Sequence, residues 1–262
     1  MLASAHKPGH TRMKVSIIIP ALNEAKYIQA TLLSVEQQAG EFEIIVVDGG
    51  STDETAEIAR QHAAVIASKR GRAVQMNAGA RQASGDALLF LHADSVIHPS
   101  ALDAVRQALR DSRTVGGTFT LRFDADKILL RLYSFFTHFK FRYFHYGDQG
   151  IFVRRSIFEQ LCGYREIPIM EDVDLLRQMR RQGRVALIDL PVTTSARRFL
   201  RHGLAAQQLL NAALVISYLL GVKPETLAGW YQSGIRKILQ GRVKGDSIEL
   251  ADPPTREGQK RR

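Results

Sequence analysis

Acidic, amide and arginine side chains follow directly on four short apolar runs within the first hundred residues. Each run is typical of a buried β-strand, and in an open α/β sheet ligands bind beyond the carboxyl ends of the strands. Carboxylates there can hold a divalent cation or ribose hydroxyls, and guanidinium groups can hold phosphate oxygens. The combination suits a nucleoside diphosphate with a divalent cation. The residues are Pro20, Asn23 and Glu24 after the first run, Asp48 and Asp53 after the second, Arg70 and Arg72 after the third, and His92 and Asp94 after the fourth.

Some of these residues also have a purely structural interpretation. Asp53 could cap the helix that follows it, because Asp is a preferred N-cap residue. Arg70 and Arg72 could form an ordinary solvated basic loop. His92 could equally be a buried histidine bonded to a main-chain carbonyl. We expect Asp48 to contact the base or ribose of a nucleotide and Arg70 to contact its base or diphosphate.

Two common nucleotide-binding motifs are missing after the first apolar run. A dinucleotide fold would carry G-x-G-x-x-G there, and a P-loop would carry G-x-x-x-x-G-K-[ST]. A sugar nucleotidyltransferase would place a glycine-rich turn with an arginine in this loop. The sequence instead reads Pro-Ala-Leu-Asn-Glu from Pro20 to Glu24, so that class is kept only as an alternative.

The elements that must position these side chains alternate between strands and helices. This alternation predicts a mostly parallel central sheet flanked by helices. Ser51 and Glu54 form a capping-box pattern at the start of the second helix. Later runs at 116–123, which alternates in polarity, at 150–153 and at 185–194 predict a mixed second half. The first strands are expected at 15–19, 43–47, 64–67 and 87–91, and the helices near 25–37, 53–62, 72–83 and 100–110.

The order of the motifs resembles that of family 2 glycosyltransferases over roughly residues 13–235. The likeness is closest to the bacterial branch described as radical-SAM or selenodomain-associated transferases, which is similar to enzymes that glycosylate carotenoid acids. It implies a GT-A fold with a C-terminal helical appendage, a nucleotide-sugar donor and inversion at the anomeric carbon. The segments that carry it are Val15–Glu24, Asp48–Asp53, Arg70–Arg72 with Gln75, Asn77 and Gly79, His92–Asp94, Gly147–Gly150 and Met170–Asp172.

The resemblance also implies the catalytic base. Family 2 enzymes take the proton from the acceptor with an acid of a Glu-Asp motif, which is Asp172 in this sequence. The structural alternative is that Glu171, Asp172 and Asp174 only favour the positive end of a helix over 172–182. Glu171 is expected on the acceptor side or in an orienting role.

Further residues are placed by the same resemblance. Asp148 and Gln149 are expected on the acceptor side, and Asn77 beside the donor. Arg197 and Arg198 could close over the donor phosphates and help the diphosphate to leave. A plain basic surface is the alternative for these two arginines.

The metal motif of the family is generally written D-x-D, and here it reads His92-Ala-Asp94. Asp94 is therefore the first candidate metal ligand and His92 the second. Mg²⁺ prefers oxygen ligands, whereas Mn²⁺ tolerates an imidazole, so either ion is open. The incomplete motif also leaves open a non-catalytic protein that binds nucleotide sugars.

The amino-acid composition limits which binding partners and which cellular compartment we expect. The chain has 262 residues, of which 45% are hydrophobic, and 36 Lys and Arg against 26 Asp and Glu give a net charge of +10. This excess favours a nucleotide, a nucleic acid or an anionic membrane. The single cysteine, Cys162, excludes an intramolecular disulfide and fits a reducing compartment. We expect a cytoplasmic protein that can sit peripherally on the cytoplasmic face of the inner membrane.

Two segments favour an apolar acceptor or a membrane surface. Residues 133–146 hold eight of the 20 aromatic residues, interleaved with basic side chains. Single-strand nucleic-acid binders carry such rings on an exposed sheet or an OB barrel, so no nucleic-acid partner is expected. Residues 204–222 carry no charge, and they predict a buried packing helix, a helix in a membrane interface or a span.

The chain is expected to divide into four parts. These are a mobile leader (1–13), a GT-A glycosyltransferase domain (14–195), a helical appendage (196–240) and a disordered basic tail (241–262).

Overall fold

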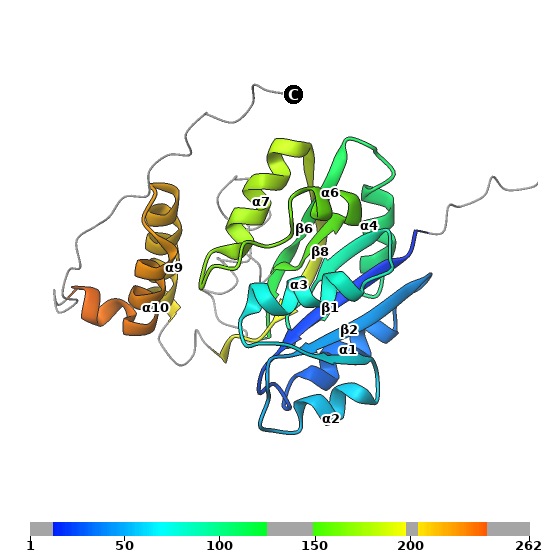
Figure 1. The fold of residues 1–262 in the computed structure, drawn as a ribbon, viewed down its shortest axis with the longest axis horizontal. Helices are drawn as coiled ribbons and strands as arrows, with labels where there is room; N and C mark the ends of the chain where they lie inside the picture. The colour runs from blue at the N-terminus through cyan, green and yellow to red at the C-terminus, as the bar shows by residue number, and fades with distance from the viewer. Residues whose placement is uncertain (1–12, 125–148, 198–203, 240–262) are drawn as a thin grey trace, which may run out of the picture.

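A computed structural model describes residues 13–124, 149–197 and 204–239 of the chain (Figure 1). Residues 1–12 of the expected leader, the aromatic segment 133–146 and the expected tail lie outside these ranges. The described strands are β1 (Val15–Ala21), β2 (Phe42–Asp48), β3 (Ala64–Ala67), β4 (Ala87–Phe90), β5 (Ser95–Ile97), β6 (Thr114–Phe123), β7 (Ile151–Arg154) and β8 (Arg184–Thr194). The described helices are α1 (Ile28–Glu36), α2 (Thr55–Arg60), α3 (Arg72–Gln82), α4 (Ala101–Ala108), α6 (Arg155–Gln160), α7 (Glu171–Gln182), α9 (Leu204–Leu219) and α10 (Pro224–Leu239).

The described strands form one sheet in the order β3-β2-β1-β4-β7-β6-β8-β5. The strands β3, β2, β1 and β4 are parallel, as the alternation of strands and helices predicted. β7 pairs antiparallel with β4 and β6, β6 pairs parallel with β8, and β5 pairs antiparallel with β8. The second half is therefore mixed, as predicted. The four parallel strands end together at the edge that carries the predicted site residues.

Helices cover both faces of the sheet because its central strand is apolar on both sides. In β1, Ile17 and Ile19 pack with residues of α1, α2 and α4, whereas Ile18 packs with residues of α3, α6 and α7. All three isoleucines are fully buried. Burial of a side chain of this size stabilises the folded state by about 1.5–3 kcal/mol. The loop that follows β1 is thus anchored to a strand packed from both sides.

Gly79 lets α3 approach the sheet closely. A Cβ atom at this position would lie 2.5 Å from Ile18 Cγ2 and 2.9 Å from Val47 Cγ2, which is closer than such atoms pack. The close approach sets α3 against the parallel strands. Its first residue, Arg72, then lies at the carboxyl edge of the sheet.

Two local predictions are wrong. The hydroxyl of Ser51 does not cap α2, because it accepts the backbone N–H of Asn23 at 3.0 Å and the helix begins at Thr55. Asp53 Oδ1 instead accepts the N–H of Thr55 at 3.1 Å. The run expected to alternate, now β6, is buried at nine of its ten positions, since it lies inside the sheet between β7 and β8.

α9 packs on the rest of the chain along one face. Leu210, Leu214 and Tyr218 are buried in a cluster with Leu227 of α10 and with apolar residues just before and within α7. The Tyr218 hydroxyl also donates to Asp174 Oδ1 at 2.9 Å. Within the described ranges, none of the helices combines the length and the apolar character that crossing a membrane requires.

Candidate functional site

A cavity of about 340 Å³ opens at the carboxyl ends of the parallel strands. Its walls come from the loops after β1, β3 and β4 and from the chain at the end of β8. Gln75 lies at its base, where its Nε2 donates to the carbonyls of Ala21 (2.9 Å) and Val47 (2.8 Å) and so ties β1 to β2. The structure brings seven of the predicted site residues to this cavity, namely Pro20, Glu24, Arg70, Arg72, His92, Asp94 and Arg197.

The loops after β1 and β2 are held together by side-chain hydrogen bonds. Asn23, at a left-handed φ of 55°, accepts the N–H of Thr52 on its Oδ1 at 2.9 Å. The N–H of Glu24 donates to Thr55 Oγ1 at 2.7 Å, and the N–H of Ala25 donates to Asp53 Oδ2 at 3.3 Å. We call these contacts, with the bond from Asn23 to Ser51 described above, the loop latch. The latch fixes the backbone that presents Glu24 to the cavity.

Asp48 and Asp53 stabilise backbone turns. Asp48 Oδ2 accepts the N–H groups of Gly50 and Ser51, both at 3.1 Å, in the turn that follows β2. The hydrogen bond from the hydroxyl of Thr55 holds the pKa of Asp53 below its usual value. Neither carboxylate lines the cavity. Asp53 thus stabilises the turn just before α2, whose N-cap residue is Glu54.

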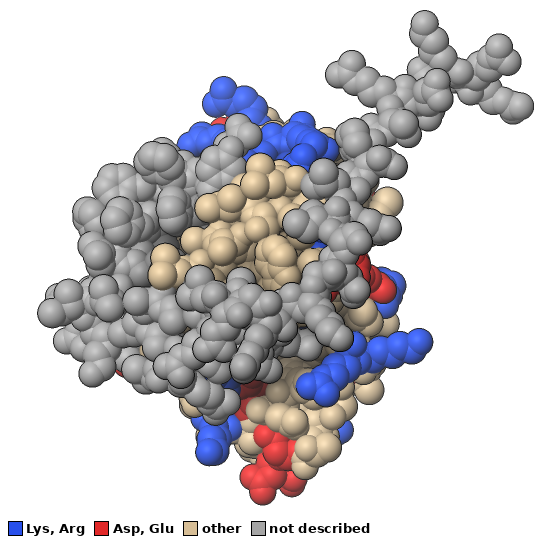
Figure 2. All heavy atoms as spheres, turned by 90° about the vertical axis from the view of Figure 1, so that its left-hand side faces the viewer, with Lys and Arg blue, Asp and Glu red and all other residues tan. Residues whose placement is uncertain are grey.

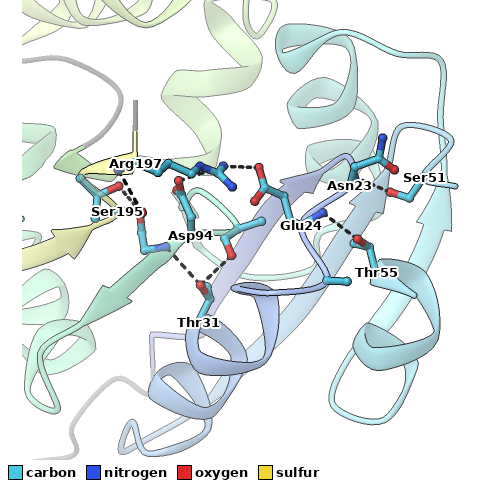
Figure 3. A network of polar contacts seen from close by, with 12 residues as sticks. Asn23, Glu24, Thr31, Ser51, Thr55, Asp94, Ser195 and Arg197 are labelled. Atoms are coloured by element: carbon cyan, nitrogen blue, oxygen red, sulfur yellow. Dashed lines mark hydrogen bonds and ion pairs between the residues drawn. The ribbon is translucent and has the colours of Figure 1, made fainter. Parts of the chain in front are cut away.

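Arg197 joins two acids across the cavity (Figure 3). A single atom of its guanidinium, Nη2, lies 2.5 Å from Glu24 Oε1 and 3.1 Å from Asp94 Oδ2. The guanidinium carbon is also 4.6 Å from the ring centre of Tyr27. The hydrogen bond to Glu24 raises the pKa of Arg197 above its already high value. The cation is thus held firmly between the loop after β1 and the loop after β4.

Asp94 is fixed by a neighbouring hydroxyl of α1. Thr31 Oγ1 donates to the carbonyl of Ala93 at 2.9 Å and accepts the N–H of Ser95 at 3.1 Å. These bonds hold the backbone on both sides of Asp94 (Figure 3). His92 lies at the start of the same turn and is half-buried at the cavity wall.

The pair Glu24 and Asp94 has the chemistry of a divalent-cation site. Two carboxylates converge on one point, and Glu24 Oε2 is buried with no hydrogen-bond partner among the described residues. Hard cations prefer such oxygen ligands. In the described part of the chain, no group of three or more His, Cys, Asp or Glu side chains is arranged to hold a metal. Within the described residues, the protein thus offers two carboxylates at this point.

A second acid pair lies at the start of α7. Glu171 and Asp172 are the first two residues of the helix, and both are buried. Arg72 donates from Nε to Glu171 Oε1, and its Nη2 lies 3.4 Å from Asp172 Oδ2. Met170, at a left-handed φ of 72°, turns the chain directly into this helix. Arg72 therefore links the candidate base to the wall of the cavity.

Tyr164 was not predicted as a site residue. It is buried, it packs edge-on against Phe90, and its hydroxyl has no hydrogen-bond partner within the described residues. Burial raises the pKa of the hydroxyl, and the negative charges of Asp172 and Glu171 raise it further. In the sequence, Tyr164 stands six residues before the Met-Glu-Asp motif. This spacing is not a known signal, so the sequence alone offered no reason to choose Tyr164. The phenol stays protonated next to the acid pair.

Several predicted residues lie elsewhere. Both atoms of the Asn77 amide bond to the backbone of Tyr164, at 2.8 Å each, and Asn77 faces a separate cavity between α3 and α6. Gln149 is fully buried and does not line the donor-side cavity. Asp148 and Arg198 lie outside the described residues.

The comparison with sequence families gives one match. Residues 16–162 match the family model described as glycosyl transferase family 2. A PGL/p-HBAD biosynthesis glycosyltransferase of Mycobacterium tuberculosis is 35% identical over 171 residues, which cover 57% of this chain and 62% of the relative. The 4,4'-diaponeurosporenoate glycosyltransferase of Staphylococcus haemolyticus is 35% identical over 112 residues, covering 39% of this chain and 30% of that protein. The chain therefore matches less than two thirds of these relatives' length.

Solved structures share the architecture. A mannosyltransferase from Pyrobaculum calidifontis, in complex with GDP-Man and Mn²⁺, superposes with a TM-score of 0.61 at 20% identity, covering 80% of this chain and 64% of that one. S. aureus TarS 1–349, in complex with UDP-GlcNAc, superposes with a TM-score of 0.57 at 20% identity, covering 70% and 58%. At such identity the likeness shows the fold.

Proposed function

Because the chain belongs to glycosyl transferase family 2 and has the GT-A fold that its sequence predicted, we propose that it transfers a sugar from a nucleoside diphosphate to an acceptor with inversion. One observation carries the proposal. The cavity at the strand ends brings two carboxylates and three arginines together beside a buried acid pair. The assignment to the radical-SAM-associated branch stays a prediction.

The donor side follows from the charges of the cavity wall. Arg70 and Arg72 present guanidinium groups that fit a diphosphate, and the similar structures solved with GDP-Man and UDP-GlcNAc support a nucleotide-sugar donor. Asp48 and Pro20 belong to the strand ends at which the base and ribose would lie. Arg197 and Arg198 would reach the diphosphate from the end of β8.

Asp172 is proposed as the general base. It takes the proton of the acceptor hydroxyl while the acceptor oxygen attacks C1 of the sugar from the side opposite the diphosphate. The bond between C1 and the diphosphate oxygen breaks, and its electron pair leaves with the nucleoside diphosphate. Arg72 orients Asp172, and Glu171 and Gln149 belong to the acceptor side. An acceptor carboxylate would attack with no proton to remove.

Asp94 and Glu24 would hold a divalent cation, with His92 next to them. When bound, Mn²⁺ or Mg²⁺ supplies positive charge to the leaving diphosphate. The similar mannosyltransferase from Pyrobaculum calidifontis was solved with Mn²⁺ beside its nucleotide sugar, which supports this assignment.

We further propose an apolar acceptor presented at an anionic membrane surface. Four large apolar residues stand exposed on α9 or directly after it: Leu209, Ile216, Leu219 and Leu220. Figure 2 shows the side of the molecule on which α9 and α10 lie, where an uncharged surface has Lys and Arg side chains above it and both basic and acidic side chains on its right and below it. An apolar face bordered in part by basic side chains suits the headgroup region of an anionic bilayer. The protein would then work peripherally on the cytoplasmic face of the inner membrane.

A thermal-shift panel of UDP-, GDP-, ADP- and dTDP-sugars, each with and without Mn²⁺, tests the donor assignment. A ligand at a hundred times its Kd stabilises the native state by about 2.7 kcal/mol, which raises Tm by several degrees in a domain of this size. The nucleotide sugar that raises Tm should then also be a substrate. The protein should transfer its sugar to an acceptor, or slowly to water when no acceptor is present. If no nucleotide sugar raises Tm, the proposal fails. Binding with pyrophosphate release from a nucleoside triphosphate would instead indicate a nucleotidyltransferase.

A further inference from the structure

The contact of Arg197 with Glu24 and Asp94 puts a cation where two carboxylates meet. The same nitrogen, Nη2, touches both acids, so its position is the one that a metal ion shared by these acids would take. The exposed fractions of the side chains are 35% for Arg197, 18% for Glu24 and 15% for Asp94. Solvent therefore screens this triad less than it screens an ordinary surface ion pair.

We propose that Arg197 is a built-in counter-ion that holds the divalent-cation position in the donor-free protein and gives it up when metal and donor enter together. The inference rests on the proposed use of a nucleotide-sugar donor. A divalent cation and a guanidinium cannot share the point between Glu24 and Asp94, because like charges at that distance repel. Either ion satisfies both carboxylates, so the two compete.

The competition makes metal binding depend on the donor. A metal that arrives alone must displace Arg197 from both acids and leave a partly buried guanidinium without its partners, which is costly. A donor diphosphate offers the released guanidinium new phosphate oxygens, and charge-assisted bonds to phosphate are strong. The donor-free protein would thus bind the metal weakly, and the donor-bound protein would bind it tightly.

The neighbours of Arg197 support this exchange. Ser195 Oγ accepts the N–H of Arg197 at 3.3 Å, and the guanidinium lies over the ring of Tyr27. The first contact involves the backbone N–H of Arg197, so it persists when the tip of the side chain turns away from the acids. Glu24 Oε2, buried and unpaired within the described residues, gives an incoming metal an oxygen that Arg197 does not use.

Titration with Mn²⁺ alone, followed by the electron paramagnetic resonance signal of the free ion, tests the inference with no donor present. The Arg197→Gln variant should bind Mn²⁺ at least tenfold more tightly than the native protein, because the two carboxylates lose their resident cation. Adding Asp94→Asn to this variant should abolish the gain. Arg110→Gln, a change of an exposed arginine at the end of α4, serves as the charge-matched control and should behave as the native protein.

An Arg197→Gln variant that binds Mn²⁺ no better than the native protein overturns the inference. If that variant does not fold, Arg197→Lys decides, since lysine keeps the charge but loses the planar guanidinium over the ring of Tyr27, holds the two acids less firmly and should raise Mn²⁺ affinity by a smaller factor. An unchanged affinity for Arg197→Lys then counts against the inference. The proposed function is judged separately by the nucleotide-sugar panel, so its failure and this one give different results.

Discussion

Arg72 Nη2 lies 3.4 Å from Asp172 Oδ2, so a cation at the start of α3, in the cavity wall, faces a carboxylate at the start of α7. The two residues are 100 positions apart in the sequence. A base that is held by a guanidinium keeps its direction, which removal of a hydroxyl proton during attack requires.

Asp172→Asn should therefore retain donor binding and lose transfer. The amide preserves the shape of the side chain but cannot take a proton, and removal of a general base typically lowers kcat by about 10²- to 10⁴-fold. Asp174→Asn is the matched control, because Asp174 bonds to Gln178 and Tyr218 rather than to the cavity. Turnover numbers with a transferred sugar check this. Near-normal turnover of Asp172→Asn would end its assignment as base.

Asp94→Ala should weaken both metal and donor binding. It removes one of the two carboxylates at the proposed cation position, so calorimetry with the donor found in the panel should show a loss of affinity in excess Mn²⁺. When a chelator is present, the difference in donor affinity between the native protein and Asp94→Ala should be smaller. Equal donor affinity for native and variant protein with Mn²⁺ would show that the donor binds without the metal.

Gly79→Ala should destabilise the fold by about 1–3 kcal/mol. The added Cβ meets the branched side chains of Ile18 and Val47 in a packed core, and this outweighs the higher helix propensity of alanine. Gly229→Ala in α10 is the control, since no atom lies within 4 Å of a Cβ built there. Urea unfolding of both variants gives the two free energies. Equal stability of Gly79→Ala and the native protein would mean that α3 can move away from the sheet.

The acid stability of the fold should depend on Glu43. Burial opposes its charge, but bonds from Ser16, Ser84 and Lys14 outweigh it and lower the pKa of Glu43 from an ordinary 4.5 to about 2. Because the folded-state pKa is depressed, the stabilisation is fully present above pH 4.5 and is lost as the pH falls toward 2. Solvent exposure of the group limits its size to the order of 1 kcal/mol.

Thermal unfolding from about pH 7 to about pH 2 checks the role of Glu43. Glu43→Gln should have a lower Tm at neutral pH and a flatter decline below pH 4.5 than the native protein. Glu166→Gln, which changes an exposed loop residue, should leave the profile unchanged. If Tm of Glu43→Gln falls with decreasing pH as steeply as Tm of the native protein, Glu43 is not the group responsible.

The exposed face of α9 should bind anionic vesicles. The double change Leu209→Ser and Ile216→Ser removes two of its apolar contacts and should reduce flotation with phosphatidylglycerol vesicles at low salt. Leu33→Ser, at an exposed position on α1, should not. A high-salt wash should release the native protein, since screening weakens a peripheral charged contact. Failure of the native protein to float would favour a soluble acceptor.

Much of the fold could be predicted from the sequence because apolar residues recur at regular spacings in most of its strands and helices. The β-branched runs of β1 and β2 and the polar turns after them placed the parallel strands and the cavity correctly. β5, with only three residues from Ser95 to Ile97, was not predicted, because a run so short has no period of its own and exists through its pairing with β8.

The positions of the candidate site residues could be predicted where strand order decides them, but not where a distant partner does. Glu24 and Asp94 follow strands, so topology alone brought them together. Asn77 was expected near the donor, yet its bonds to Tyr164 are tertiary contacts that no local pattern shows. The bond of Asp53 to Thr55, in contrast, is a local contact of the kind that the sequence had left open. The contact from Arg197 to Glu24, which joins two walls of the cavity, spans 173 positions.

The loop latch has a consequence for the entropy of ligand binding. Ordering the backbone of one residue costs about 1–2 kcal/mol, and a loop that orders only when its ligand arrives subtracts this cost from the affinity. Asn23 and Glu24 are already fixed by Ser51, Thr52 and Thr55 during folding. The two loops therefore meet an incoming nucleoside as a rigid rim, and small differences between nucleosides translate directly into differences of affinity instead of being absorbed by a loop that adapts.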